Sequence, residues 1–455
     1  MQNSNSSSVA APDAASREDL IQSVLSHIEG RRDEIVSLLQ RMIRTKSVNP
    51  SFDPASPGEG EMANLVTAEY ETLGVKVERY EAKPGRPNVV ARVPGTDPEG
   101  PHLLVNCHLD TVDAAVEEWV DPFTGETVTE WTVDPFGGEL RDGRIYGRGA
   151  ADHKSPIAAI IAALEALRAN GVELRGSLTC IHDADEETGG EQGMTYLREQ
   201  IPFDFDMALY ACTSEFTPLG REFFTAMGED NIVRAIAGWH TYELQFEGQN
   251  LHNMTPLRGY GAVEAAHAFL RRIQPYIDEV NSQVDALEGK AHPAMRLSGI
   301  DTGPRVAFHH QAENCTVVLN RRISPGVDPE QALADLQAFV DAHNEEYPAN
   351  QASLRIARDL KAHETPADHP VVTGLTRAVK TVTGREPSVV GMPAPVGISG
   401  LLSSYPVPTV LFGYGLVNMH HAIDEHIEVE ALIKTAKAYA VALIEWLEVD
   451  GDRAS

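Results

Sequence analysis

Imidazole and carboxylate side chains that could bind metal ions recur in short polar stretches of this chain. Most of these stretches follow apolar, strand-like residues and lead into a glycine-rich or polar turn. Because α/β enzymes carry their ligands at the carboxyl ends of strands, we expect these side chains to meet there. Imidazoles mixed with carboxylates suit Zn²⁺, Mn²⁺ or Co²⁺ rather than a thiolate-bound metal. The set comprises His108, Asp110, Asp152, Glu186, Glu187, Glu215 and His421.

His108 and Asp110 are two residues apart, so their side chains share one face at the end of an extended strand. A metal-binding imidazole usually has its second nitrogen held by a carboxylate or a carbonyl group. We therefore expect Asp110 to orient His108 rather than to bind metal. Asp152 follows a Gly-Arg-Gly turn and precedes a helical stretch; taken alone, it is more typical of an N-cap.

Glu186 and Glu187 are adjacent, so their side chains diverge. One of them can bind metal while the other faces the cleft, which is where a general base is required. The alternative is a solvated acidic turn, which the nearby Asp183 and Asp185 favour. Two ions that share a bridging carboxylate need about two histidines and three carboxylates, with open positions for water and substrate.

The elements that must position these residues alternate between strands and helices up to about residue 230, which indicates an α/β layer structure. Helical periodicity is present over 17–44, 61–73 and 155–170. Strands are expected at 76–80, 177–181 and 206–212, with a hairpin-like pair at 88–93 and 102–107.

The pattern changes near residue 232. An edge-type strand at 241–246 is followed by a helix at 261–273, a strand at 315–323 and a helix at 329–347. A helix at 369–382 and a strand at 409–412 then resume the first pattern. We expect a lead-in over 1–18, a first domain made of 19–232 and 359–455, and an inserted domain over 233–358.

Composition excludes several classes of partner. The formal net charge is −30, with 37 basic against 67 acidic residues, so the phosphates of nucleic acid would be repelled. We expect no membrane partner, because no apolar run has the length of a membrane span. The first residues lack the basic and apolar regions of a signal peptide and are typical of disorder. Four cysteines without CxxC spacing predict buried free thiols in a reducing, cytoplasmic compartment.

Taken together, four stretches resemble the M20 family of co-catalytic zinc peptidases and amidohydrolases, which includes acetylornithine deacetylase, succinyl-diaminopimelate desuccinylase, aminoacylase-1 and glutamate carboxypeptidase. The resemblance runs from about residue 20 to 448. It implies a mixed-sheet α/β catalytic domain with an inserted α+β, ferredoxin-like lid or dimerisation domain. The four stretches are 108–112, 142–154, 185–190, and His421 with Glu425.

The resemblance also implies roles for the candidate residues. One ion would be bound by His108, Asp152 and Glu215, and the other by Asp152, Glu187 and His421, so that Asp152 forms the bridge. Glu186 would be the general base. The assignment of Glu215 competes with Cys212, because the Glu-Pro-Thr that is usual in the family stands here as Glu215-Phe216-Thr217.

In the inserted block, Gly248 to His252 matches the family's histidine motif. The resemblance implies a homodimer through this block, in which His252 reaches the active site of the neighbouring subunit. Arg322 matches an arginine that grips a substrate carboxylate, a pairing that gives orientation as well as energy; the alternative is a surface arginine on a strand.

Three departures from the family pattern bear on the substrate pocket. His309 and His310 replace a segment that usually carries Asn-x-x-Pro, and Gly397-Ile398-Ser399-Gly400 lacks the usual acidic residue. Asn320 stands where aspartate is common. We expect His309, His310 and Ser399 to line the pocket, which leaves the substrate class open.

The sequence therefore predicts a hydrolase of an amide or related C–N bond in a small molecule, with two divalent ions, zinc first and manganese or cobalt as alternatives. A second hypothesis within the same fold is an aminohydrolase of a non-peptide, aromatic amine, which the altered segment at His309 and His310 favours. A third is a catalytically silent metal-binding relic. The intact Glu186 argues against the third, because a binding module needs no general base.

Overall fold

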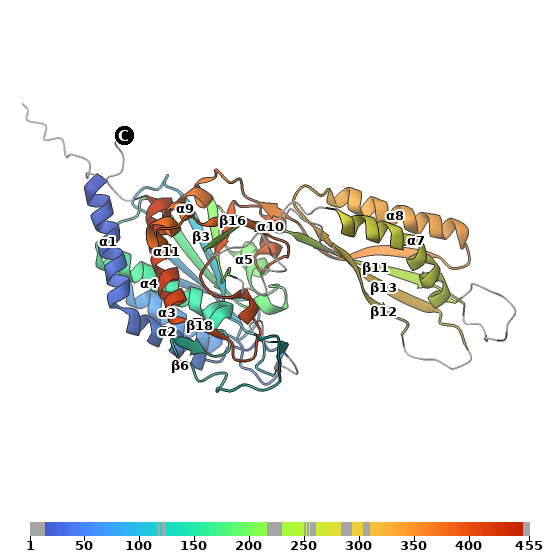
Figure 1. Cartoon of the computed structure of the whole chain (residues 1–455), viewed down its shortest axis with the longest axis horizontal. Helices are drawn as coiled ribbons and strands as arrows, with labels where there is room; N and C mark the ends of the chain where they lie inside the picture. Colours follow the sequence, from blue (N-terminus) through green and yellow to red (C-terminus); the bar gives the residue numbers. More distant parts are fainter. Residues whose placement is uncertain are drawn as a thin grey trace, which may run out of the picture. The chain divides into compact units, whose positions relative to one another are not determined.

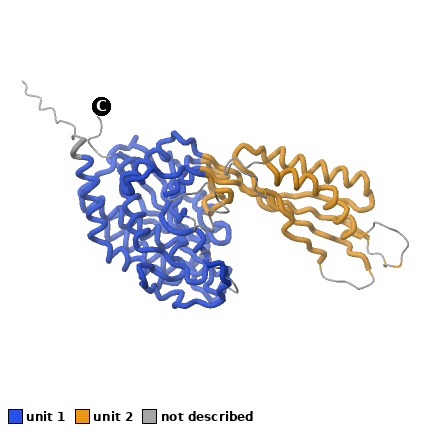
Figure 2. Tube along the Cα trace, viewed as in Figure 1, with its two compact units in different colours: residues 1–234, 365–390, 407–455 blue, residues 235–364, 391–406 orange. Residues whose placement is uncertain are grey.

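The computed structural model describes residues 14–115, 119–120, 124–215, 230–249, 252, 254, 261–283, 294–303 and 310–448. The chain divides into two units (Figure 2). The first consists of Met1–Arg234, Thr365–Val390 and Val407–Ser455, and the second of Ala235–Glu364 and Gly391–Pro406. The inserted block predicted from the sequence is one stretch, 233–358; in the structure the segment Gly391–Pro406 belongs to the same unit as Ala235–Glu364.

A large mixed sheet confirms the expected α/β class. Its strand order is β1-β2-β8-β3-β9-β17-β10-β15, with β16 paired to β10. The strands are β1 (Lys76–Glu81), β2 (Pro87–Val93), β3 (His102–His108), β8 (Ser177–Asp183), β9 (Met207–Ala211), β10 (Asn231–Ile236), β15 (His363–Glu364), β16 (Ser388–Met392) and β17 (Thr409–Phe412).

The centre of this sheet is parallel. β3 pairs in parallel with both β8 and β9, and β17 pairs in parallel with β9. The carboxyl ends of these strands therefore meet at one edge, and the register sets His108 opposite Asp183. The hairpin expected between 88–93 and 102–107 is wrong, because β8 lies between β2 and β3. β8 is buried along almost its whole length, and a central position covers both of its faces.

Helices of the first unit are α1 (Ala14–Gly30), α2 (Arg32–Arg44), α3 (Gly60–Thr72), α4 (Ser155–Ala169), α5 (Met194–Gln200), α9 (Pro370–Thr383) and α11 (Val429–Leu447) (Figure 1). The periodic stretch 17–44 is two helices rather than one. The break falls at Gly30 and Arg31, because glycine loses more backbone freedom in a helix than other residues do. Short strands complete this unit: β4 (Trp119–Val120), β5 (Thr127–Val128), β6 (Glu139–Arg141), β7 (Arg144–Tyr146) and β18 (His426–Glu428).

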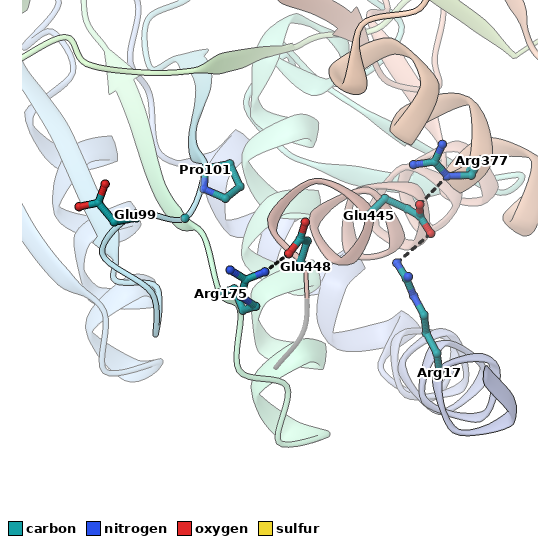
Figure 3. A pocket seen from close by; sticks show the side chains of 8 residues that line it. Arg17, Glu99, Pro101, Arg175, Arg377, Glu445 and Glu448 are labelled. Atoms are coloured by element: carbon teal, nitrogen blue, oxygen red, sulfur yellow. Dashed lines mark hydrogen bonds and ion pairs between the residues drawn. The ribbon is translucent and has the colours of Figure 1, made fainter. Parts of the chain in front are cut away.

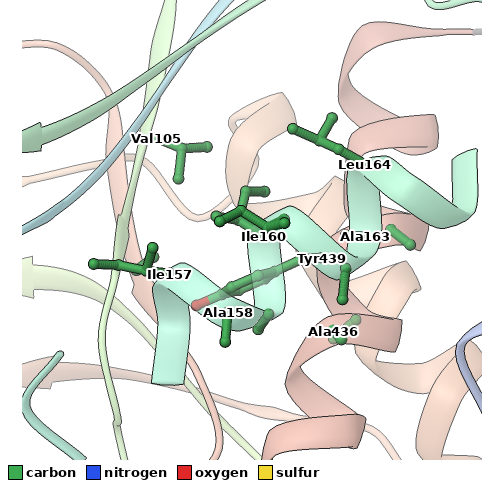
Figure 4. Packing of buried hydrophobic residues seen from close by; sticks show 14 of the residues in the cluster. Val105, Ile157, Ala158, Ile160, Ala163, Leu164, Ala436 and Tyr439 are labelled. Atoms are coloured by element: carbon green, nitrogen blue, oxygen red, sulfur yellow. The ribbon is translucent and has the colours of Figure 1, made fainter. Parts of the chain in front are cut away.

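The core of the first unit is built on α4 and α11, which are apolar on nearly every side. Alanines on both helices, among them Ala158, Ala163 and Ala436, are fully buried, and Figure 4 shows them where the two helices meet. The Tyr439 hydroxyl, buried in the same cluster, donates to the carbonyl oxygen of Phe412 at 2.7 Å. This contact ties α11 to the end of β17, and so to the sheet edge where the candidate residues lie.

The second unit has the β-α-β-β-α-β order of a ferredoxin-like fold, as the resemblance implied. Its antiparallel sheet has the order β12-β13-β11-β14, and α7 and α8 pack together on one face (Figure 1). Its elements are β11 (Gly238–Glu247), α7 (Ala262–Ser282), β12 (Met295–Asp301), β13 (Asn314–Ile323), α8 (Pro329–Glu346), β14 (Ala352–Leu360) and the short α10 (Ser399–Ser404).

The expected edge strand at 241–246 is wrong, because β11 pairs with β13 on one side and β14 on the other. Its alternating burial has another cause: the helices cover only one face of the sheet, so every second side chain remains accessible to water. No helix in the described part of the chain is long and apolar enough to span a membrane.

Tight packing of α4 gives a first prediction. Ala163 is fully buried, whereas Ala169 in the last turn of the same helix is exposed. Replacing Ala163 by Leu forces extra methylenes into a packed core and should lower the free energy of unfolding by about 1–3 kcal/mol, as measured by urea denaturation. The control, Ala169→Leu, should change it by less than about 0.5 kcal/mol. Equal effects of the two substitutions would contradict the packing described here.

Candidate metal centre

The carboxylate of Asp152 lies at the centre of a cluster of imidazoles. Its Oδ1 is 3.2 Å from Nε2 of His108 and 3.0 Å from Nε2 of His153. Its Oδ2 is 3.2 Å from Nε2 of His421 and 3.3 Å from Nδ1 of His420. Burial alone would raise the pKa of Asp152, but the four imidazoles hold it well below its usual value. Asp152 is therefore a carboxylate whose two oxygens face two sides of one site.

Asp152 does not cap the helix that follows it. The N-cap position of α4 is Lys154, and the backbone of Asp152 is not helical. The buried Lys154 ammonium instead donates to the carbonyl oxygens of Met42 and Thr45, at 3.0 and 2.9 Å. Burial lowers the pKa of Lys154 to about 7. The turn that carries Asp152 is thus attached to the end of α2.

His108 is oriented by Asp110, chiefly through the main chain. Its Nδ1 is 2.9 Å from the carbonyl oxygen of Asp110 and 3.4 Å from the carboxylate Oδ1. The Asp110 carboxylate also accepts hydrogen bonds from the backbone N–H groups of Glu186 and Glu187, at 3.1 and 3.2 Å, and from the Asn49 amide at 2.8 Å. Asp110 therefore positions the two glutamates as well as the histidine.

Glu186 and Glu187 follow β8 in a short 3-10 turn (η2, Glu186–Thr188), and their carboxylates face different histidines. Oε2 of Glu187 is 2.9 Å from Nε2 of His421, whereas Oε2 of Glu186 is 3.8 Å from Nε2 of His108. Oε1 of Glu186 accepts from the Tyr210 hydroxyl at 3.4 Å. Removal from water raises the pKa of Glu186 to about 8, with the charges of Glu187 and Asp152 adding to the shift.

The solvated acidic turn is not what the structure shows. Asp183 and Asp185 are both buried. The Asp183 carboxylate accepts from the Asn106 amide at 2.7 Å, and burial raises its pKa to about 7. Asp185 accepts from the Thr188 hydroxyl and is 3.2 Å from the Arg86 guanidinium. Asp183 and Asp185 thus hold the turn through buried hydrogen bonds, whereas Glu186 and Glu187 are only partly buried.

Glu425 ties the His421 loop to the Asp152 turn. Its fully buried carboxylate accepts from the backbone N–H groups of Gly149, Ala151 and Asp152, at 3.0, 2.8 and 3.0 Å. It also accepts from Nη1 of Arg148 at 2.6 Å. From the sequence alone, Glu425 was recognisable only as part of a motif with His421. Four converging donors show that it joins two segments that are far apart in the chain.

Three groups of side chains place their potential ligand atoms within 4.8 Å of one another: His108 with Asp152 and His153, His108 with Glu186 and Glu187, and Asp152 with Glu187 and His421. Glu215 and Cys212, both of which the structure describes, belong to none of these groups. One carboxylate oxygen of Glu215 instead accepts from the backbone N–H of Gly415 at 3.2 Å. The structure thus brings together every ligand expected from the sequence except Glu215.

The contacts of His153 and His420 with Asp152 were not predicted from the sequence. His153 is adjacent to Asp152, and neighbouring side chains in regular structure point apart, so nothing in the spacing predicts that both face one site. His420 is adjacent to His421 and lies 2.6 Å, through Nε2, from the Thr213 hydroxyl. The only available signal was that two of the expected ligands, Asp152 and His421, each have a histidine beside them.

The substrate-binding candidates belong to the second unit. Arg322 is buried rather than on the surface, and its Nη1 donates to the carbonyl oxygen of Pro393 at 3.2 Å. Ser399 is also buried and accepts from the backbone N–H of Val396 at 2.9 Å. His252 and His310 form a β-bridge, with ring centroids 5.5 Å apart. His309 lies outside the described residues.

The donor set fits divalent cations. Three carboxylates, Asp152, Glu186 and Glu187, lie close together, and like charges in such proximity require compensation by positive charge. One oxygen of Glu187 and both ring nitrogens of His153 are buried without a hydrogen-bond partner among the described residues. Bound cations would use the lone pairs of the Glu187 oxygen and of one imidazole nitrogen, and they would offset the negative charge, as expected of mixed nitrogen and oxygen sites.

A separate pocket of about 530 Å³ is lined mainly by arginine and glutamate side chains (Figure 3). Glu445 pairs with both Arg17 and Arg377, at 3.2 and 2.6 Å, and Arg175 pairs with Glu448. These ion pairs satisfy one another, and because one partner of each pair is accessible to water, they add little to the stability of the fold. The catalytic chemistry therefore belongs to the Asp152 cluster.

Comparison with known families agrees with this site. The model of the peptidase family M20/M25/M40 matches residues 104–445, so the chain belongs to that family. It is a metal-dependent hydrolase of C–N bonds.

Individual relatives are distant but match nearly the whole chain. The N-formyl-4-amino-5-aminomethyl-2-methylpyrimidine deformylase of Bacillus subtilis is 23% identical over 448 residues, covering 94% of this chain and 97% of the relative. Human carnosine dipeptidase 1 has a similar fold, with a TM-score of 0.66 and 18% identity, covering 96% of this chain and 100% of that one. The Bacillus subtilis YXEP protein, described as a dinuclear metal binding peptidase from the M20 family, has a TM-score of 0.63 and 14% identity, covering 92% and 99%.

The Glu425 contacts generate a second prediction. Glu425→Gln removes the charge opposite Arg148 and turns an amide NH₂ towards backbone N–H groups. Breaking a buried pair in this way should lower the free energy of unfolding by about 3–5 kcal/mol. The control is Glu428→Gln, an exposed partner of Arg144 at 3.5 Å, which should cost less than about 1 kcal/mol. Chemical denaturation of both variants measures the difference; equal stability of the two would contradict the role given to Glu425.

Proposed function

We propose that this protein hydrolyses an amide bond of a small molecule, such as an N-acyl amino acid or a dipeptide, with two divalent ions bridged by Asp152. The observation that carries the proposal is the placement of the Asp152 carboxylate between two imidazoles. Oδ1 faces His108 and Oδ2 faces His421, each at 3.2 Å, and Glu187 lies 2.9 Å from His421. A pair of ions requires two sets of ligands that share one carboxylate, and the sets around His108 and His421 share Asp152 in this way.

Zinc is the first expectation for both ions, with manganese and cobalt as alternatives, since all three accept imidazole and carboxylate ligands. His108 and Asp152 would hold one ion, and Asp152, Glu187 and His421 the other. When bound, the pair would polarise the scissile carbonyl group and lower the pKa of a water molecule towards neutrality.

Glu186 is the proton carrier in this proposal. Oε2 of Glu186 faces His108, and Oε1 is held by the Tyr210 hydroxyl, so Oε2 is the atom that takes the proton from water. The same carboxyl group then passes the proton to the departing nitrogen. A carboxylate at this place suits both transfers, because it can accept a proton from water and then release it to the departing nitrogen.

The second unit supplies recognition in this account. Arg322 would hold a substrate carboxylate, and His252 would stabilise developing negative charge in the cleft of a neighbouring subunit. The motif around His252 and the burial of Arg322 support these roles. In this proposal the functional form is a homodimer, because His252 acts in the cleft of the neighbouring subunit.

The substrate class rests on chemistry shared by the relatives. A deformylase and a dipeptidase, as their names state, both act on amide bonds of small molecules. A screen of N-formyl and N-acyl amines, N-acyl amino acids, dipeptides and aromatic amines with the metal-loaded protein tests the proposal. Formation of a carboxylate and an amine supports amide hydrolysis. Release of ammonia from an aromatic amine without a new carboxylate would favour the aminohydrolase alternative, and turnover of no substrate would favour a silent relic.

Glu186 and Glu187 should give opposite signatures when each is replaced by glutamine. Glu186→Gln should keep both ions yet lose turnover by about 10²–10⁴-fold, because the amide cannot accept a proton. Glu187→Gln should lose metal and activity together, because it weakens a ligand. Elemental analysis beside steady-state kinetics separates the two outcomes. If Glu186→Gln sheds metal while Glu187→Gln stays loaded, the roles are reversed; full activity of Glu186→Gln would rule out the mechanism.

The shared active site is tested by mixing two inactive variants, His252→Ala and Glu186→Ala. A mixed dimer contains one site with both residues intact, so activity should reappear after subunit exchange. When the subunits mix at random, about half of the dimers are mixed, and each has one working site of two. The activity should therefore approach about one quarter of the wild-type rate. Exchange is followed with differently tagged chains. Exchange that proceeds without recovery of activity would show that His252 does not act across the interface.

A further inference from the structure

Residues 114–132 form a segment between β3 and β6 that is rich in acidic residues and contains two of the four tryptophans of the chain. In the described part of the segment, β4 and β5 pair as a short antiparallel hairpin. The two tryptophans, Trp119 and Trp131, lie in different surroundings. This difference shows what the segment can do beside the metal centre.

Trp131 anchors the base of the segment. Its Nε1 donates to the carbonyl oxygen of Ala114 at 2.9 Å, which closes the loop, and the guanidinium of Arg148 lies 5.2 Å from the centre of its ring. The backbone N–H and the hydroxyl of Thr132 both donate to the carboxylate of Asp424, at 2.8 and 2.6 Å. The segment is therefore attached to the turn and to the loop that carry the candidate metal ligands.

Trp119 packs against the same turn and loop. It is partly buried on a small cluster formed by Ala151, Met419 and Ala422. Two of these residues are the chain neighbours of Asp152 and His421. Because neighbouring Cα atoms are about 3.8 Å apart and packed side chains approach to about 4 Å, the indole lies within roughly 10 Å of the Asp152 carboxylate. A small molecule bound at Asp152 can therefore reach the indole.

The His421 side of the site is open to water. The side chain of His421 is 52% exposed, whereas that of His108 is 1% exposed. A substrate therefore approaches from the side of His421, which is also the side where Trp119 packs. Small-molecule sites are lined mostly by apolar and aromatic side chains, with a few polar groups that fix orientation. The indole of Trp119 is suited to be such a lining surface, because it is only partly buried.

We propose that Trp119 is a specificity residue whose indole stacks on a planar aromatic group next to the scissile amide of the substrate. This inference rests on the hydrolase function proposed above and names a substrate class for it. Stacked aromatic rings gain more than the burial of their area alone provides, whereas a saturated ring of similar size gains only the area. Trp131 is a poorer candidate, because Arg148 already lies over its ring.

The test compares substrates that differ only in the planarity of one ring. N-benzoylglycine and N-cyclohexanecarbonylglycine place the ring on the acyl side of the amide. N-acetylphenylalanine and N-acetylcyclohexylalanine place it on the amine side. For each pair, the ratio of kcat/KM for the planar over the saturated compound is measured with zinc-loaded protein. Comparing this ratio between variants cancels the difference in intrinsic reactivity of the two compounds.

Trp119→Leu keeps an apolar side chain but removes the aromatic face, so it should lower the ratio by about 2–10-fold for the pair whose ring reaches the indole. Trp119→Phe should keep the ratio within about 2-fold of the wild-type value. The matched control is Val120→Ala, because Val120 is 58% exposed and the next side chain along a strand points to the opposite face. This control should leave both ratios unchanged.

An unchanged ratio for both pairs in Trp119→Leu would overturn the proposal. Equal losses for the planar and the saturated compound would also overturn it, because they would show that Trp119 only supports the loop. Circular dichroism and zinc content check folding. Should Trp119→Leu not fold, Trp119→Met takes its place, since methionine fills irregular gaps more readily.

Failure of the proposed function gives a different result, since the wild-type protein would then hydrolyse none of the four compounds. Their dissociation constants, measured by calorimetry with zinc-loaded Glu186→Gln, then decide the role of Trp119 without turnover. Tighter binding of a planar compound that is lost when Trp119→Leu is added supports the stacking. Equal binding of planar and saturated compounds, or binding of none, would overturn it.

Discussion

A buried carboxylate must be matched by positive charge or by hydrogen-bond donors, and Asp152 imposes this constraint on everything around it. Its two oxygens face four imidazoles that come from the end of β3, from its own turn and from the loop before β18. The parallel centre of the sheet brings the first of these and the glutamate turn to one edge. Without that common edge, the ligands would be spread along the chain and could not share an ion.

Two further carboxylates hold the segments in place through hydrogen bonds. Asp110 accepts the backbone N–H groups of Glu186 and Glu187, and Glu425 accepts those of the Asp152 turn. Both act on main-chain groups, so they fix the path of a loop rather than the rotamer of one side chain. Charge-assisted hydrogen bonds of this kind are stronger than neutral ones, which suits a site whose ligands carry like charge.

Elements whose signal lies within their own residues were predicted correctly, whereas contacts that depend on distant segments were not. The strand 409–412 and the helices 61–73 and 155–170 were predictable because their periodicity and turn residues lie within the segment. The hairpin predicted at 88–107 was wrong because β8, which comes later in the chain, lies between its two strands. The edge position predicted for β11 was wrong because the alternation of apolar and polar residues reports a sheet with one covered face, not a strand at the edge. At the site, His108, Asp152, Glu187 and His421 came together as expected, whereas His153 could not be foreseen because its direction depends on the fold of the turn.

Anomalous scattering at the zinc absorption edge tests the central claim most directly. A crystal of the zinc-loaded protein should show two peaks, one on each side of the Asp152 carboxylate, each within about 2.0–2.2 Å of one of its oxygens. One peak would be shared with His108 and the other with His421 and Glu187. A single peak, or two peaks of which only one touches Asp152, would contradict the bridging carboxylate on which the account depends.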